Sequence, residues 1–582
     1  MLNIFTSTKP EQFASFFTGD PVCKFAAALY QKMQEGHICI DISSNQEDIQ
    51  LLKQSAYVGF TLDKVKPFIV QDSKLYLYKY YGYESDILSF IQRQAAQENL
   101  INKRIESLNQ IVLHADLYDT FSDLPPSKDN IDWQFIAMTK SFIQGFSIIT
   151  GGPGTGKTTT IAKLLTLLFE ENKQLRIALA APTGKAAIRM KEALLSNKNY
   201  AKIKDQLPDP DSKTIHRLLG AITNQHTFKY NKENKLNYDV IIIDEASMVD
   251  IALMSKLISA LALTTRLILL GDQNQLSAVG AGSLLKDLCD NVPDLVQLSP
   301  CSEKILQGKL KQAQLDNITI NKQDSFLQDA ITQLQISRRF SHNSHIGKLS
   351  FALLHDKGLP ISDPNNPLSF YLIPQEDKDF VHIDTQYDEK YLDQIITHYK
   401  AYMQETDIQK ALALLNNTRV LCGVRESEQG VYHINYKIET KLAQEGAIKK
   451  NTPFYDNRPI MITKNNPELK IFNGDIGIIR NNRAYFGTGH GDIIELHPAL
   501  LSEFETVYAM TIHKSQGSEF DHVLVLLPQD TDNKILNKQL LYTGVTRAKK
   551  KVIIQSSIEV LEQTLKTEVS RISGIPNRLK SL

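Results

Sequence analysis

Cysteine is scarce in this sequence, and its placement excludes two common ways of holding a fold together. The 582 residues contain five cysteines, and no two of them form a Cys-x-x-Cys pair. This spacing argues against a structural zinc site and against a disulfide framework. It is typical of a protein that is kept in a reducing cytosol.

Long apolar runs are also lacking. The first residues have no basic stretch followed by an apolar one, so we expect no secretory signal peptide. No apolar run reaches the roughly 18 residues that a membrane-spanning helix requires. We therefore expect a soluble, cytoplasmic protein with no membrane partner.

An excess of charge of either sign is absent too. Lysine and arginine together number 65, as do aspartate and glutamate, so no overall basic field would draw nucleic acid to the chain. Any DNA binding must come from local contacts to phosphate and sugar. A hydrophobic content of 42% excludes general disorder, and the length predicts several packed units.

The pattern of apolar runs predicts an α/β protein of three units. Residues 1–128 carry no glycine-rich loop and end in a proline-containing turn sequence. In 129–335 short apolar runs alternate with helical periodicity, which predicts a parallel sheet covered on both faces. A second such set falls in 336–582, and short β-like runs at about 450–505 predict a small β barrel inserted into it.

The strongest motif is a complete phosphate-binding loop between a predicted strand and a predicted helix. It has the pattern G-x-x-x-x-G-K-[ST] and is followed by another threonine, giving Gly151, Gly152, Pro153, Gly154, Thr155, Gly156, Lys157, Thr158 and Thr159. Backbone amides of such a loop and the helix N-terminus bind phosphate oxygens. Lys157 is expected to reach the outer phosphates of ATP and Thr158 to ligate Mg²⁺.

Two further strand ends complete the predicted ATP site. Asp244 and Glu245 follow an apolar strand, and we expect Asp244 to face the metal and Glu245 to deprotonate the attacking water. Gln275, after the next strand, is a candidate sensor of the γ-phosphate, because an amide can bond a phosphate and register its loss. Each of these patterns alone is more typical of a solvated loop.

Hydrolysis also requires positive charge on the transferred phosphate, and an arginine from a neighbouring domain can supply it. Arg339 and Arg547 are the candidates that lie outside the first α/β unit. Arg338 beside Arg339 leaves that assignment open by one position, and a surface or salt-bridged arginine is the ordinary alternative for each.

Taken in order, the motifs resemble those of superfamily 1 helicases, and more closely those of the RecD family, the alpha subunits of bacterial exodeoxyribonuclease V (RecBCD). Beyond the phosphate-binding loop, the matching segments are APTGKAA at 181–187, TIHRLLG at 214–220, DEAS at 244–247, GDQNQL at 271–276, SRRF at 337–340, TIHKSQGSEF at 511–520 and YTGVTRA at 542–548. Support for the closer match comes from GHIC at 36–39, LYLY at 75–78, RPIMI at 458–462 and FNGDIG at 472–477. The chain departs at SRRF, where the family has Ser-Tyr-Arg-Phe and Arg339 is the aligned position.

The resemblance implies a bacterial, cytoplasmic 5′→3′ DNA helicase subunit with two RecA-like domains that hold ATP and Mg²⁺ between them. It implies that Gln134 reads the adenine edge and that Glu519 bonds the ribose. The N-terminal unit resembles the part that docks on the gamma subunit. The implied partners are single-stranded DNA, duplex DNA ends, and RecB-like beta and RecC-like gamma subunits in a heterotrimer.

A set of hydroxyl, imidazole and lysine side chains in loops is predicted to form a DNA track. Such groups suit phosphate contacts that carry no sequence information, and we expect them at the sheet ends opposite the phosphate site. The residues are Thr183, Lys185, Thr214, His216, Thr511, His513 and Lys514. For any one of them, a capping role within its loop is the alternative.

Three other functions were weighed against a DNA motor. The ATP site could be a structural switch in an assembly, or the chain could be a stand-alone RecD-like helicase, although the sequence before Trp133 is too short for the extra N-terminal modules of such enzymes. The chain could also be a nuclease, but it has no Asp…Asp-x-Lys cluster of the kind a two-metal nuclease needs. We therefore expect nuclease activity in a partner chain.

Overall fold

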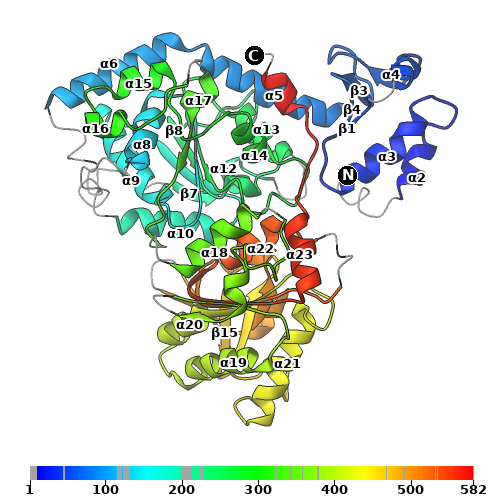
Figure 1. Ribbon diagram of the computed structural model, residues 1–582, viewed down its shortest axis with the longest axis vertical. Helices are drawn as coiled ribbons and strands as arrows, with labels where there is room; N and C mark the ends of the chain where they lie inside the picture. The colour runs from blue at the N-terminus through cyan, green and yellow to red at the C-terminus, as the bar shows by residue number, and fades with distance from the viewer. Residues whose placement is uncertain are drawn as a thin grey trace.

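The computed structural model shows three α/β regions joined in one chain (Figure 1). The described residues are 9–43, 46–114, 121, 131–197, 211–222, 227–321, 325–339, 344–356, 358–376, 379–466, 468–488, 492–530, 533 and 535–580. The expected boundary at 128–129 lies outside these residues.

The first large sheet is a parallel sheet of six strands in the order β10-β5-β9-β8-β6-β7. Its strands are β5 (Phe146–Gly151), β6 (Ile177–Ala181), β7 (Asp211–Thr214), β8 (Val240–Ile243), β9 (Arg266–Gly271) and β10 (Ile331–Leu334). The central strands are apolar along their length, because both faces of a parallel sheet are covered by helices. This confirms the predicted α/β class for this region.

Alternate residues of these strands enter two separate cores. Ile149 and Ile242 face a core that includes α6 (Glu98–His114), α8 (Trp133–Ile143), α9 (Lys157–Glu171) and α10 (Gly184–Leu195). Ile148 and Ile241 face the opposite core, with α5 (Tyr78–Ala95), α12 (Ile215–Leu218), α13 (Ile251–Ser259) and α14 (Leu284–Asp290). Three short helices complete the region: α15 (Pro300–Leu306), α16 (Gln312–Leu315) and α17 (Phe326–Ala330).

The second large sheet has the order β11-β12-β21-β20-β13-β19 and is parallel except at the edge strand β11. Its strands are β11 (Gln375–Glu376), β12 (Phe380–Asp384), β13 (Thr418–Cys422), β19 (Ala509–Thr511), β20 (Phe520–Leu526) and β21 (Ala548–Gln555). Its helices are α18 (His345–Leu354), α19 (Glu389–Gln404), α20 (Ile408–Asn417), α21 (Val431–Gln444), α22 (Lys538–Val545) and α23 (Ile558–Lys566).

The insertion between β13 and β19 is an antiparallel sheet in the order β17-β16-β15-β14-β18. Its strands are β14 (Arg458–Ile462), β15 (Ile476–Arg480), β16 (Arg483–Gly487), β17 (Ile493–Leu496) and β18 (Phe504–Thr506). The predicted β region is therefore present as a five-stranded antiparallel sheet. Its closure into a barrel stays a prediction, because the strand pairs of the described residues include none between β17 and β18.

The N-terminal region has a small sheet of its own, in the order β1-β4-β3-β2. Its elements are α2 (Pro10–Ser15), α3 (Cys23–Gln34), β1 (Cys39–Asp41), α4 (Gln46–Lys53), β2 (Val58–Gly59), β3 (Phe68–Gln71) and β4 (Lys74–Leu77). The long helices α5 and α6 continue from it onto the first large sheet (Figure 1).

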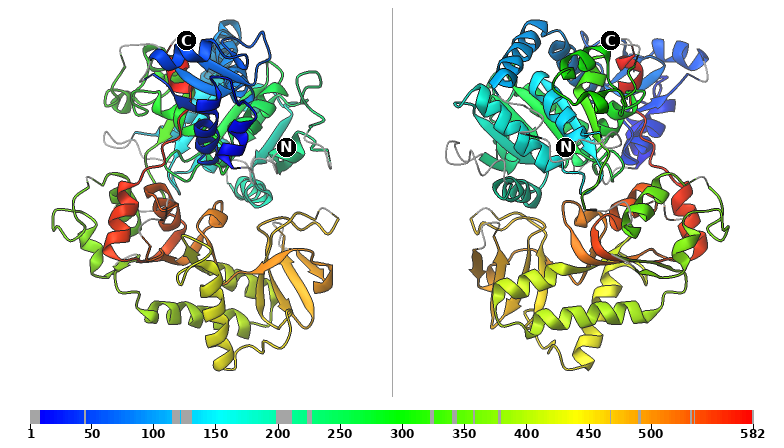
Figure 2. Two further views of the ribbon diagram at one scale, coloured as in Figure 1. Left: turned by 90° about the vertical axis from the view of Figure 1, so that its right-hand side faces the viewer. Right: turned by 60° about the vertical axis from the view of Figure 1, so that its left-hand side comes forward.

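The C-terminal end of the chain returns to the first large sheet. After α23 the chain leaves the second sheet, and α24 (Ile575–Leu579) packs against α5 and α14 (Figure 2). Within the described parts of the chain, no helix combines the length and apolar character needed to cross a membrane.

Candidate active site

The phosphate-binding loop connects β5 to α9, as the motif requires. Gly154 and Gly156 have φ of +75° and +89°, a left-handed conformation that glycine adopts without strain. A Cβ at Gly154 would collide with the Cβ of Arg339, and one at Gly156 would collide with the amide of Gln134. Both glycines are therefore required by backbone shape and by close neighbours.

Lys157 lies at the start of α9 and points back into this loop. Its Nζ donates to the carbonyl oxygens of Gly151, at 2.6 Å, and of Gly152, at 3.2 Å. The Thr155 hydroxyl donates to the Gly152 carbonyl at 2.8 Å. The lysine is thus held at the mouth of a helix N-terminus, which itself favours anions.

Asp244 and Glu245 leave β8 toward the same loop. Burial and the neighbouring Glu245 raise the pKa of Asp244, and the Lys157 ammonium opposes this rise. Glu245 has φ of +51°, an uncommon backbone conformation for a residue with a side chain, and its amide donates to Asp244 Oδ1 at 2.8 Å. Asp244 therefore lies within electrostatic reach of Lys157.

Thr158 and Asp244 fit the expected Mg²⁺ site in donor chemistry, since hydroxyl and carboxylate oxygens suit this ion. The described residues contain no group of three or more His, Cys, Asp or Glu side chains that could hold a metal. A metal at Thr158 and Asp244 would therefore complete its shell with phosphate oxygens and water, as Mg²⁺ commonly does.

Gln275 lies beside Asp272 in a network that crosses between the two large sheets. Its Nε2 donates to Asp272 Oδ2 at 3.1 Å, and the Tyr542 hydroxyl donates to the same oxygen at 3.0 Å. The Gln275 Oε1 is buried and has no hydrogen-bond partner among the described residues. Burial and Asp272 raise the pKa of Tyr542 well above its usual value, so its hydroxyl remains a donor.

Tyr542 is a residue that sequence reasoning missed. Its hydroxyl lies 3.2 Å from where a Cβ on Gly152 would be, so a side chain of the second sheet reaches the phosphate-binding loop of the first. Its place in the YTGVTRA segment, five residues before Arg547, was the available signal.

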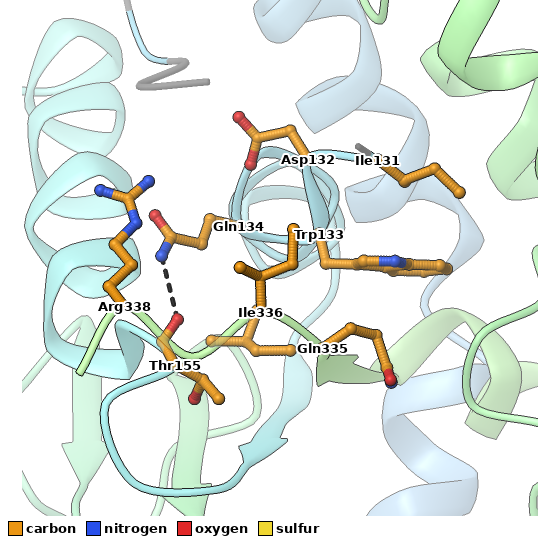
Figure 3. Close-up of a pocket in the computed structure, with 9 residues that line it drawn as sticks. Ile131, Asp132, Trp133, Gln134, Thr155, Gln335, Ile336 and Arg338 are labelled. Atoms are coloured by element: carbon orange, nitrogen blue, oxygen red, sulfur yellow. Dashed lines mark hydrogen bonds between the residues drawn. The ribbon is translucent and has the colours of Figure 1, made fainter. Parts of the chain in front are cut away.

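The two adjacent arginines Arg338 and Arg339 have different surroundings. The Arg339 guanidinium forms an ion pair with Glu519, and its Cβ lies against Gly154. Arg338 instead lines a pocket beside Gln134, and its backbone amide donates to the Gly154 carbonyl at 2.8 Å (Figure 3). Arg339 is therefore the one that bridges the phosphate-binding loop and the second sheet.

Glu519 is surrounded by cations. Burial raises its pKa, but Arg339 and Lys549, the latter at 3.6 Å, lower it by more, so the net pKa lies below the usual value. The carboxylate is therefore ionised and committed to Arg339 in this conformation.

Arg547 is buried, and its guanidinium donates to backbone carbonyls of the second domain. Its Nε donates to the Thr543 carbonyl at 3.1 Å and its Nη1 to the Ser518 carbonyl at 3.2 Å. The structure also brings Arg189 of α10 to this place, where it donates to the Gly517 carbonyl. Sequence reasoning missed Arg189, which follows the APTGKAA segment by two positions.

Gln134 lines a pocket between α8 and the end of β10. Its Nε2 donates to the Thr155 carbonyl at 3.0 Å (Figure 3). Its Oε1 accepts from Lys163 Nζ at 3.2 Å. The pocket is lined by Ile131, Asp132, Trp133, Gln134, Thr155, Leu334, Gln335, Ile336 and Arg338. The two hydrogen bonds fix the orientation of the amide next to the phosphate-binding loop.

The DNA-track residues of the first sheet do not lie opposite the phosphate site. Strands β5, β6 and β7 are parallel, so their carboxyl ends share one edge, and β9 and β8 separate β5 from β6. The expected placement is therefore wrong: Thr183, Lys185, Thr214 and His216 follow strands at the same edge, displaced sideways from the loop at Gly151.

Several track residues also have the local roles that were their alternative. Thr183 and Thr214 cap α10 and α12, each accepting from a backbone amide at 3.2 Å. Thr511 accepts from the Lys514 amide at 3.3 Å, and Lys514 pairs with Glu505. Burial lowers the pKa of His513, with a further contribution from Arg571.

Lys185 lies where the inserted sheet meets the first large sheet. Burial, with Arg189 and Arg419 adding to it, lowers the pKa of Lys185 to about 7, and Asp475 opposes the shift. Phe472 of the insertion lies under the Arg217 guanidinium, at 5.7 Å from its ring centroid. The insertion therefore covers one side of the predicted DNA track.

Comparison with known proteins agrees with this geometry. Residues 134–281 match the family described as "AAA domain", and residues 506–555 match "UvrD-like helicase C-terminal domain". The chain is 32% identical over 566 residues to the RecBCD enzyme subunit RecD of Haemophilus influenzae, covering 90% of this chain and 84% of that protein.

Two other comparisons are weaker. The ATP-dependent RecD2 DNA helicase of Deinococcus radiodurans is 27% identical over 69% of this chain and 46% of that protein. A structure of Pif1 helicases at forked DNA is 17% identical and covers 77% of this chain and 95% of that one, with a TM-score of 0.37. The identity and coverage of the Haemophilus relative are decisive: the chain belongs to the RecD family of superfamily 1 DNA helicase subunits.

Proposed function

We propose that this chain is an ATP-driven 5′→3′ DNA helicase that works as the RecD subunit of a RecBCD complex in the cytoplasm, where it acts in double-strand break repair and recombination. The observation that carries the proposal is that Tyr542 and Glu519 of the second domain reach Asp272 and Arg339, which lie beside the loop that holds Lys157. Such an interface lets ATP binding change the contact between two RecA-like domains.

In this proposal the loop at 151–158 binds the phosphates of ATP, with Thr159 beside it, and ATP with Mg²⁺ supplies the reactive γ-phosphoryl group. Lys157 neutralises phosphate charge, Glu245 accepts the proton of the attacking water, and Gln275 registers whether the γ-phosphate is present. Arg339 and Arg547 stabilise the charge that develops on the transferred group. Gln134 orients the base and Glu519 the ribose.

Single-stranded DNA would lie along the residues at the carboxyl edges of both sheets. Thr183, Lys185, Thr214 and His216 belong to one domain, and Thr511, His513 and Lys514 belong to the other. Because the two groups are on different domains, closing the domains on ATP would move one set of phosphate contacts relative to the other. Repeated cycles would move the chain along DNA.

The other subunits of the complex would supply the nuclease activity. The RecD relatives are named as subunits of the RecBCD enzyme, and the match covers nearly their whole length. We assign nuclease activity to a RecB-like partner and docking on a RecC-like partner to the N-terminal region. The stand-alone alternative is less well supported, since this chain spans under half of the RecD2 relative.

The test is DNA-stimulated ATP hydrolysis and unwinding of 5′-tailed and 3′-tailed duplexes, by the chain alone and with co-expressed partners. We expect unwinding of the 5′-tailed duplex only, and loss of stimulated hydrolysis by at least about 100-fold in Lys157→Gln. Lys173→Gln, an exposed lysine just beyond the same helix, is the matched control.

Two results would contradict the proposal. Hydrolysis that DNA does not stimulate, with no unwinding in the complex, would favour the structural-switch alternative. Degradation of DNA by the purified chain with Mg²⁺ would show that the nuclease assignment is wrong.

A further inference from the structure

The C-terminal strap, residues 567–579, ties the second large sheet back to the rest of the chain. It leaves α23 and runs to the first sheet, where Ile575 is fully buried in the same core as Ile38 (Figures 1 and 2). Gly574 donates its amide to the buried carboxylate of Glu84 at 2.8 Å, and Ser573 donates to Asp287 at 2.7 Å. The strap is thus a built contact and not a loose tail.

One arginine of the strap holds the loop that follows the candidate phosphate sensor. Arg571 Nη1 donates to the carbonyls of Ala278 and Gly280, each at 2.7 Å, and of Gly282 at 2.8 Å. We name residues 276–282 the sensor loop, because it begins directly after Gln275. Three carbonyls of this loop therefore share a single donor nitrogen.

The N-terminal region takes part in the same junction. Gly282 donates its amide to the Gly36 carbonyl at 2.9 Å, Ile38 donates to the Ile572 carbonyl at 2.9 Å, and Ile572 donates to His37 Nδ1 at 3.0 Å. A Cβ at Gly36 would lie 2.7 Å from Arg571 Nε. The GHIC segment, for which the nucleotide site offers no role, is therefore a seat for the strap.

The other end of the sensor loop is held by the second domain. Leu276 donates its amide to the Thr543 hydroxyl at 3.1 Å and accepts from the Gln516 amide at 3.0 Å, and its side chain is buried in the second domain's core. The loop is therefore fixed at one end by the second domain and at the other by Arg571 and Gly36. Gln275 lies immediately before the first of these attachments.

We propose that Arg571 is a positioning residue: by holding the sensor loop against the GHIC segment, it fixes Gln275 relative to both domains and couples the N-terminal region to ATP hydrolysis. If the N-terminal region moved when it docked on its partner, Gly36 would move with it and would displace Gly282. The seven residues of the sensor loop would transmit this displacement to Gln275. This inference rests on the ATPase function proposed above.

The test compares Arg571→Met, Arg571→Lys and Arg578→Met in the full chain. Met keeps an unbranched apolar stem but is two atoms shorter than arginine and has no donor, whereas a lysine ammonium can still donate to carbonyls with one atom less of reach. Arg578 belongs to the same strap but pairs with Glu84 and Ser85, so its variant loosens the strap without touching the sensor loop.

We expect Arg571→Met to lower the DNA-stimulated kcat about fivefold or more with the KM for ATP changed less than about twofold, and Arg571→Lys to fall between it and the wild type. Amide exchange at Gly282 should accelerate in Arg571→Met and not at the phosphate-binding loop. Arg578→Met should lower thermal stability and leave kcat unchanged.

The proposal is overturned if Gly282 exchanges faster in Arg571→Met while kcat stays at the wild-type value. It is also overturned if KM rises and kcat with and without DNA falls alike, since that would indicate general damage to the ATP site. Should Arg571→Met fail to fold, a wild-type kcat in Arg571→Lys with fast Gly282 exchange would have the same meaning. A wild-type chain with no ATPase at all would instead refute the proposed function.

Discussion

At the scale of single residues, the most unusual backbone in the site belongs to Glu245. A left-handed conformation at a residue with a side chain costs on the order of 1 kcal/mol or more, and such strain persists where surrounding contacts enforce it. Here the amide of Glu245 donates to Asp244, and the charge of the Glu245 carboxylate contributes to the raised pKa of Asp244. The strain is thus tied to the position of the predicted general base.

The arginine pair gives the first prediction at this scale. Arg339 pairs with Glu519 and lies against Gly154 of the phosphate-binding loop, whereas Arg338 borders the Gln134 pocket. We expect Arg339→Ala to lower kcat for ATP hydrolysis by about 100-fold or more, as loss of an arginine that stabilises transferred phosphate does. Arg338→Ala should mainly raise the KM for ATP, and steady-state kinetics of both variants would decide. The reverse assignment predicts the opposite split.

Lys185 gives a second prediction. Its pKa of about 7 means that the ammonium form is lost as pH rises from 6 to 8, while a DNA phosphate would favour that form. We therefore expect affinity for single-stranded DNA to fall over this range, with uptake of a proton on binding. Lys185→Arg should flatten the dependence, because arginine stays charged. If DNA-binding titrations gave the same pH dependence of affinity for both proteins, Lys185 would not be a DNA contact.

At the scale of elements, the seat of α24 on α5 depends on one buried carboxyl group. Glu84 is fully buried, and burial raises its pKa to about 7 despite the Gly574 amide and Arg578 beside it. Asp287 also faces this group and raises the pKa further. Because the neutral form is favoured in the folded state, stability from this group is complete below its ordinary pKa of 4.5 and is lost as pH rises through about 7.

We therefore predict that the protein loses thermal stability between pH 5 and pH 8, and that Glu84→Gln loses less. The difference should be on the order of 2 kcal/mol at pH 8, since each unit of pKa shift corresponds to about 1.4 kcal/mol. Asp287 also has a raised pKa and is present in both proteins, so the difference between their pH profiles reports Glu84 together with its coupling to Asp287. Parallel melting curves across this pH range would show that Glu84 is ionised in the folded chain.

At the scale of the whole molecule, the two large sheets meet through few but specific contacts. Tyr542 to Asp272, Thr543 to Leu276 and Arg189 to Gly517 all cross between them. Such contacts can differ between two domain arrangements, and a ligand that binds one arrangement better shifts the population toward it.

We accordingly expect an ATP analogue with Mg²⁺ to change the separation of the two domains, measured by X-ray scattering or by distances between spin labels. The same analogue should produce no change in Lys157→Gln at matched concentration. Identical distances in the presence and absence of nucleotide in the unmodified chain would contradict movement along DNA by domain closure.

The sequence by itself determined the parts of the protein that depend on contiguous residues. Three features follow from local rules. Glycines that allow a tight backbone predict the phosphate-binding loop at 151–158, and carboxylates after an apolar strand predict the acidic pair after β8. Apolar runs that alternate with helices predict the parallel sheets. The antiparallel insertion follows from the same local rules, whereas its closure into a barrel stays a prediction, because closure depends on pairing between strands at opposite edges.

Only the tertiary structure decided which distant residues share a site. It shows that Arg338 and Arg339 have different surroundings, and that Tyr542 and Arg189 lie at the interface of the two domains. It places the DNA-track residues of the first sheet at the same sheet edge as the phosphate site. It also shows that Gly36, Gly282 and Arg571 are in contact. Gly36, Gly282 and Arg571 lie hundreds of positions apart in the sequence, and no periodicity records contacts between them. The burial of Leu276 and Ile575 in cores other than that of their own sheet brings these segments together.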